Sequence, residues 1–100
     1  MKISKSLENG CVTIKPEGWL DTVSSPELGN VIEAVDTADA IVLDFELVEY
    51  MSSAGLRQVL AAHRKAKSLG ASFSVINVCS PVMSIFKMTN IDKKLNIEAR

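Results

Sequence analysis

Two adjacent serines, Ser52 and Ser53, stand where an apolar run of the chain ends and a helical pattern begins. A hydroxyl at the start of a helix lies beside unpaired backbone N–H groups and the positive end of the helix dipole. Those groups stabilise a capping side chain, and they stabilise a phosphate group equally well. The pair therefore predicts either a structural cap or a site that carries a phosphate.

Other residues with catalytic potential are scarce. His63 is the only histidine, and it lies on the apolar stripe of a predicted helix, which favours a packed or half-buried role over that of a general base. A hydrolase that uses Ser53 with His63 conflicts with helical geometry, which separates the two by about 15 Å along the axis. The chain also lacks phosphate-loop, dinucleotide-binding, serine-hydrolase and metal-ligand motifs. We expect a non-enzymatic protein with no catalytic residues, no cofactor and no metal.

The composition is that of one ordinary globular domain, which we expect to span residues 1–100. Apolar residues make up 47% of the chain, which is enough for a modest core without disulfides. Twelve acidic and eleven basic residues give a net charge of −1, and this balance argues against a nucleic-acid partner.

The two cysteines, Cys11 and Cys79, lie among apolar residues, as buried free thiols do in a reducing compartment. The first residues lack the apolar stretch of a signal peptide, and no apolar run approaches the ~20 residues of a membrane span. We therefore expect a cytoplasmic protein with no membrane contact. No feature of the sequence indicates an oligomer, so we expect a monomer.

The first half of the chain predicts a hairpin followed by a helix. Two short strands, near Met1–Leu7 and Val12–Ile14, flank the turn signal Asn9-Gly10, and Pro16–Gly18 is expected to close the second strand. A helix follows, opened either by a capping box of Ser24 with Glu27 or by Ser25 ahead of Pro26. Its apolar stripe ends before Asp36–Asp39 and comprises Leu28, Val31, Ile32 and Val35.

The second half predicts a strand, a helix and a parallel strand. Ala40–Leu43 is a continuous apolar run, typical of a strand covered on both faces. After the serines, a helical stripe runs to the stop signal Gly70, and Ala71–Val78 is the next strand. Together they form a right-handed βαβ unit. The stripe comprises Leu56, Val59, Leu60, His63 and Ala66.

A third, short helix follows the cap-and-proline signal Ser80-Pro81 and ends at Thr89-Asn90. Leu95 and Ile97 predict an edge strand near the end of the chain. The fold class is therefore α/β: a small mixed sheet with about three helices, the first two on one face.

Three blocks of the sequence resemble the STAS family, the small domains of anti-sigma factor antagonists. The central block, Tyr50–Leu56, is similar to the family's aromatic-Met/Ile-Asp-Ser-Ser/Thr-Gly-Leu stretch between a strand and a helix. Upstream, Gly18–Asp21 resembles the family's Gly-Glu-Leu-Asp, and downstream Ser80–Met88 resembles its Ser-Pro segment. The blocks occur in the family's order and span almost the whole chain.

The resemblance implies a regulatory switch. In the family, a partner that is both anti-sigma factor and serine kinase binds the unphosphorylated antagonist and thereby frees a sigma factor, and phosphorylation ends the binding. A serine phosphatase completes the cycle. The position of the family's phosphoacceptor falls on Ser53, and Asp21 resembles the acidic residue near it. The implied partner-binding residues are Asp21, Tyr50, Met51, Ser53, Gly55 and Leu56, with Met83 a further member of an apolar patch around the serine.

The central block departs from the family motif at two positions. Ser52 replaces the Asp, and Ala54 replaces the second Ser or Thr. Ser52 is therefore a second candidate for the phosphoacceptor, or only the helix cap. Trp19 also stands where the upstream block has a carboxylate. The alternative function is a STAS interaction module that is not phosphorylated, in another signalling or transport-linked assembly.

Overall fold

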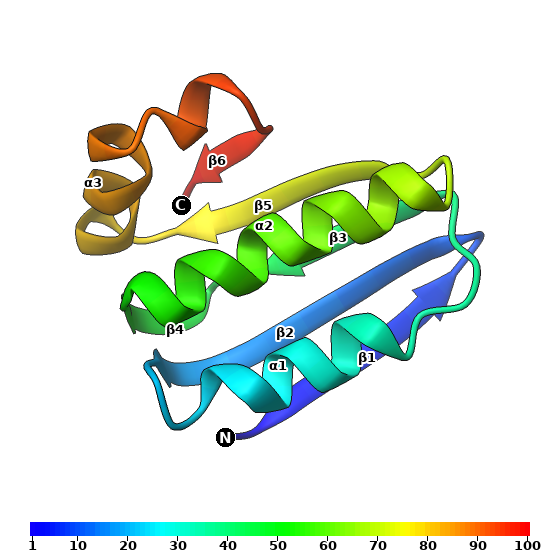
Figure 1. Ribbon diagram of the computed structural model, residues 1–100, viewed down its shortest axis with the longest axis horizontal. Coiled ribbons are helices and arrows are strands. Elements are labelled where there is room, and N and C mark those ends of the chain that lie inside the picture. Colours follow the sequence, from blue (N-terminus) through cyan, green and yellow to red (C-terminus); the bar gives the residue numbers. More distant parts are fainter.

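Six strands form one sheet in the order β1-β2-β3-β5-β6, with β4 paired to β2 beyond the end of β3 (Figure 1). The computed structural model describes all residues, Met1–Arg100. Only β1 runs antiparallel to its neighbour. The strands are β1 (Ile3–Glu8), β2 (Cys11–Leu20), β3 (Ala40–Asp44), β4 (Leu47–Met51), β5 (Ser72–Val78) and β6 (Ile97–Ala99). The helices are α1 (Ser25–Glu33), α2 (Ser53–Ser68), α3 (Ser80–Met88) and a short 3-10 helix, η1 (Ile91–Lys93).

Both α1 and α2 lie on one face of the sheet, as the sequence predicts, and α3 lies at the end of the sheet where β5 finishes (Figure 1). The predicted α/β class, the hairpin, the parallel β3-α2-β5 unit and the edge strand β6 are confirmed. The expectation that β3 is covered on both faces is wrong. Ile41 and Leu43 are fully buried under the helices, whereas Ala40 and Val42 on the opposite face are only half-buried.

Strand β2 continues to Leu20, so the prediction that Pro16–Gly18 closes it is wrong. Pairing with β3 ends at Ile14, and pairing with β4 begins at Glu17. Pro16 falls between these two ladders, where a residue without an N–H interrupts neither of them. The amide of Glu17 donates to the Lys2 carbonyl of the β1 side, so β2 remains a strand across the proline.

Strand β4 is absent from the sequence prediction. Asp44-Phe45-Glu46 looks like the polar end of one strand, but Phe45 is fully buried and its amide donates to the Ile76 carbonyl. The side chain of Asp44 accepts from the Glu46 amide and from Asn77 Nδ2, which holds this bend in place. The chain then resumes pairing with β2 as β4.

The helix ends follow local signals in part. Helix α2 stops at a Schellman motif, in which Gly70 adopts a φ of 70° and the Ala71 amide donates to the Ala66 carbonyl. The capping box of α1 does not form, because Ser24 bonds the preceding turn and Glu27 pairs with the terminal amine of Met1 at 2.7 Å. At α3 the N-cap is Cys79 rather than Ser80.

One apolar core of 21 buried residues joins the helices to the sheet. Cys79 is buried within it and Cys11 is half-buried, and both thiols are free. None of the helices combines the length and the apolar character that a membrane crossing requires.

Candidate functional site

The start of α2 lies against the end of β2. The Ser52 amide donates to the Leu20 carbonyl at 2.8 Å, and the Ser52 hydroxyl donates to the same oxygen at 3.2 Å. That hydroxyl also accepts from the Ala54 amide at 3.2 Å, which makes Ser52 the N-cap of α2. Of the two serines, Ser52 is therefore the structural one.

Ser53 is the first residue of α2, and its side chain is exposed. Its hydroxyl forms no hydrogen bond with the rest of the chain, in contrast to that of Ser52. A free hydroxyl at this position lies beside the amide groups and the positive end of a 16-residue helix. The site can thus accept a negatively charged group without the loss of an existing contact.

Gly55 and Met51 are buried beneath this surface rather than part of it. A Cβ atom on Gly55 would lie 2.7 Å from the Met51 Cγ atom and 2.9 Å from the Leu20 carbonyl oxygen. Met51 itself is 1% exposed. Both residues set how closely α2 approaches β2, and their contact with a partner stays a prediction.

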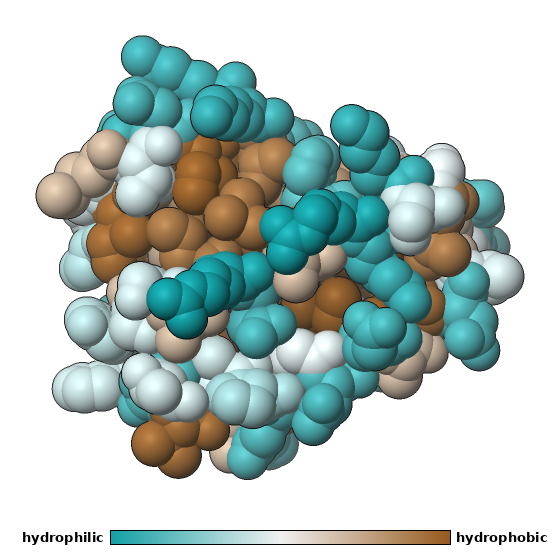
Figure 2. Space-filling model, in the orientation of Figure 1, coloured by the Kyte–Doolittle hydropathy of each residue, from teal (hydrophilic) through white to brown (hydrophobic).

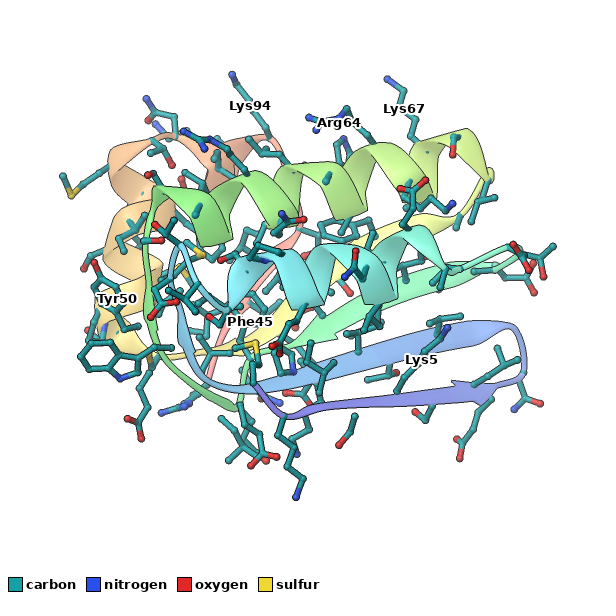
Figure 3. The ribbon with its side chains drawn as sticks, turned by 60° about the horizontal axis from the view of Figure 1, so that its bottom comes forward. Lys5, Phe45, Tyr50, Arg64, Lys67 and Lys94 are labelled. Atoms are coloured by element: carbon teal, nitrogen blue, oxygen red, sulfur yellow. The ribbon has the colours of Figure 1, made fainter.

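An exposed aromatic pair, Trp19 and Tyr50, stands next to the serines. The register of β2 with β4 places the two residues opposite each other, with ring centroids 5.2 Å apart and ring planes inclined by 47°. Their side chains are 59% and 44% exposed, and Tyr50 projects at the end of the sheet (Figure 3). Sequence reasoning included Tyr50 but omitted Trp19 from the site, because only the unpredicted strand β4 reveals the pairing. Large aromatic side chains in such settings are enriched at protein interfaces.

Asp21 organises the turn that joins β2 to α1. Its Oδ1 atom accepts from the amides of Val23 and Ser24 and from the Ser24 hydroxyl, at 2.9 to 3.0 Å. These bonds, above all those from Ser24, hold the pKa of Asp21 below its ordinary value. Asp21 follows directly after Leu20, to which Ser52 is bonded, so a carboxylate that is ionised at neutral pH lies in the segment beside the start of α2.

The remaining predicted residues lie near but not within this surface. Leu56 is half-buried on the first turn of α2, and Met83 is half-buried on α3. His63 is half-buried and meets Phe73 edge-on, with ring centroids 5.7 Å apart, which agrees with a packing role. The structure therefore brings together Ser52, Ser53, Trp19 and Tyr50, with Asp21 on the adjoining turn.

Comparison with known proteins gives a family match and several solved structures of the same fold. Residues 3–97 match the family described as Mlab, STAS domain. An anti-sigma factor antagonist from Mycobacterium paratuberculosis superposes with a TM-score of 0.88 at 25% identity, over 99% of this chain and 86% of that one. The anti-sigma factor antagonist SpoIIAA, in its unphosphorylated form, superposes with a TM-score of 0.71 at 20% identity, over 99% and 88%. A sulfate transporter family protein from Wolinella succinogenes gives a TM-score of 0.80 at 12% identity, over 94% and 80%.

The family match covers nearly the whole chain, and solved anti-sigma factor antagonists share its fold. The chain belongs to the STAS domain family.

Proposed function

We propose that this protein is a cytoplasmic anti-sigma factor antagonist whose partner is both an anti-sigma factor and a serine kinase. The unphosphorylated chain binds this partner through the surface around Ser53, which releases a sigma factor. Phosphorylation of Ser53 ends the binding, and a serine phosphatase restores the active form. One observation carries the proposal: Ser53 is the exposed, unbonded hydroxyl at the start of α2, while its neighbour Ser52 is engaged as the cap.

The switch acts by charge. A phosphate adds about −1.5 to −2 charges at neutral pH, and the start of a helix tolerates them. The penalty falls on the complex, because the partner must then bury a dianion beside Trp19 and Tyr50. An unpaired buried charge costs several kcal/mol, and about 3 kcal/mol already weakens binding more than a hundredfold. Asp21, ionised at neutral pH, adds repulsion.

The proposal is tested by incubation of the chain with ATP and the anti-sigma kinase of the same organism, followed by mass spectrometry. We expect one phosphate on the wild type and on Ser52→Ala, and none on Ser53→Ala. Calorimetry then compares the affinity of the kinase for the phosphorylated and unmodified chains.

Modification of Ser52 instead of Ser53 would contradict the assignment. Tight binding to a partner with no phosphate on either serine would favour the alternative, a STAS interaction module that is not phosphorylated. The two departures from the family motif, Ser52 and Ala54, are the features that favour this second function.

A further inference from the structure

Charge is unevenly distributed over this nearly neutral chain. Helix α2 holds four of the eleven basic residues and none of the twelve acidic ones. The three ion pairs of the structure involve Met1, Lys2 and Lys15, so none of them neutralises a base of α2. The four bases of α2 are Arg57, Arg64, Lys65 and Lys67.

Three of these bases share the outer side of the helix. Arg57, Arg64 and Lys67 are exposed and follow each other at spacings of seven and three residues, which places them on one face. Figure 3 shows Arg64 and Lys67 projecting from the same side of the molecule as Lys94, which lies after η1. Lys65 instead turns toward α1 and donates to the Glu33 carbonyl.

Apolar surface lies beside this basic face. Figure 2 shows it gathered between α2 and α3 and bordered by hydrophilic residues. Leu56 and Leu60 on α2 are half-buried, as is Ile85 on α3. Further along α2, a cavity of about 350 Å³ has Phe73 and Leu95 among its walls, with Lys67 and Lys94 also lining it. We call this region, Leu56, Leu60, Arg57, Arg64, Lys67 and Lys94, the α2 face.

We propose that the α2 face binds an acidic amphipathic helix of a partner protein. Apolar side chains of that helix cover Leu56 and Leu60, and its carboxylates meet the bases on either side, since complementary charges orient and accelerate docking. The bases from Arg57 to Lys67 extend over about 15 Å, the length of roughly ten helical residues. The proposal goes beyond the function proposed above, because it requires neither Ser53 nor its phosphate.

The charge of the α2 face favours an acidic helix over a second copy of the chain and over nucleic acid. In a symmetric dimer through the α2 face, each copy would present its bases to those of the other, and like charges oppose such contacts. Nucleic acid would gain from the bases but would leave the apolar surface without a matching contact, and the chain as a whole carries a charge of −1. An acidic helix with one apolar side satisfies both parts of the surface.

The test uses the full chain, labelled with 15N, and a synthetic helical peptide of three turns with leucines on one side and glutamates on the flanks. We expect amide shifts along α2 and around Lys94, and a Kd that rises about tenfold in Lys67→Glu. The matched control is Lys5→Glu, an identical change on exposed strand β1, which leaves the Kd unchanged. Leu60→Ala weakens binding as well, and Ser53→Ala does not.

Four outcomes would overturn the proposal. The first is equal binding of a peptide with lysine in place of glutamate. The second is equal binding of a glutamate peptide without leucines, with no effect of Leu60→Ala. The third is tighter binding of a single-stranded oligonucleotide to the same face. The fourth is a concentration-dependent dimer, seen by sedimentation, that Lys67→Glu alters.

Discussion

At the scale of single residues, the two adjacent serines have separate roles. Ser52 caps α2 and bonds the Leu20 carbonyl, whereas the Ser53 hydroxyl is free. Loss of a serine cap costs about 1 kcal/mol of stability, and surface substitutions without such contacts change it by less than about 0.5 kcal/mol. We expect Ser52→Ala to lower the free energy of unfolding by about 1 kcal/mol. Ser53→Ala should change it by less than about 0.5 kcal/mol, and urea titrations of both variants measure the difference.

A loss of stability in Ser53→Ala equal to that in Ser52→Ala would contradict this division of roles. Far-UV spectra of both variants serve as the control, because neither change removes a core contact.

The turn at Asp21 should make stability depend on pH. The hydrogen bonds from Ser24 and Val23 lower the pKa of Asp21 in the folded state from its ordinary 3.8, so the unfolded chain takes up this proton first. The Asp21 carboxylate therefore makes its full contribution to stability above pH 3.8. That contribution is lost as the pH falls through the lower folded-state pKa. We expect the difference in Tm between the wild type and Asp21→Ala to be present at neutral pH and to shrink in strong acid, once the folded-state carboxyl is protonated.

A difference in Tm that persists unchanged in acid would show that the Asp21 side chain acts by packing and not by charge. Solvent exposure keeps the effect small, so a calorimetric scan of both proteins in the same buffers is needed.

Local pattern was sufficient to place the serines, but not to sort the residues around them. A cap and a free hydroxyl differ only in which backbone groups they reach, and Ser52 reaches Leu20, 32 residues away in the sequence. Trp19 and Tyr50 meet only through the pairing of β2 with β4. Met51 and Gly55 belong to the family motif, yet they are buried. Their place in the motif reflects packing, which sequence spacing alone does not distinguish from binding.

At the scale of elements, the approach of α2 to β2 depends on Gly55. A Cβ atom there would lie 2.8 Å from the Leu20 Cβ atom and 2.9 Å from a backbone oxygen that cannot move aside. Overpacking of this kind costs about 1–3 kcal/mol. We expect Gly55→Ala to lower the free energy of unfolding despite the higher helix propensity of alanine.

Gly29 in α1 is the matched control for Gly55. The three atoms nearest to an added Cβ atom would all belong to the Gln58 side chain, whose amide can swing away. Gly29→Ala should therefore be neutral or stabilising by up to about 1 kcal/mol. Equal effects of the two substitutions, measured in parallel urea titrations, would show that close packing at Gly55 is unimportant.

Elements with strong local periodicity were predictable, and elements defined by their partners were not. Helix α2 has its stripe, its cap and its Gly70 stop within one segment. Strand β4 has only five residues, and the bend at Phe45 precedes it. The extension of β2 past Pro16 depends on the gap between its partner strands β3 and β4. The sequence around Pro16 does not reveal that gap.

At the scale of the molecule, the parallel strands place Ser53 and the basic side of α2 next to each other. Strands β2, β4 and β5 end at the same edge of the sheet, and all three helices begin there (Figure 1). Ser53 and the aromatic pair stand at this edge, while the bases of α2 lead away from it along one side. The α2 face begins at Leu56 and Arg57, within one helical turn of Ser53, and extends away from it toward Lys67.

This arrangement predicts that charge at Ser53 changes binding without loss of the fold. The substitution Ser53→Asp places a carboxylate at the positive end of α2, which should stabilise the chain by about 0.3–1 kcal/mol. The same substitution should weaken binding of the anti-sigma kinase, because the carboxylate must be desolvated. Exposed Ser68, in the last turn of α2, is the matched control: Ser68→Asp should destabilise the helix slightly and leave the kinase affinity unchanged. If the affinity for the kinase instead rose and fell with the stability of each variant, charge at Ser53 would act through folding and not at the interface.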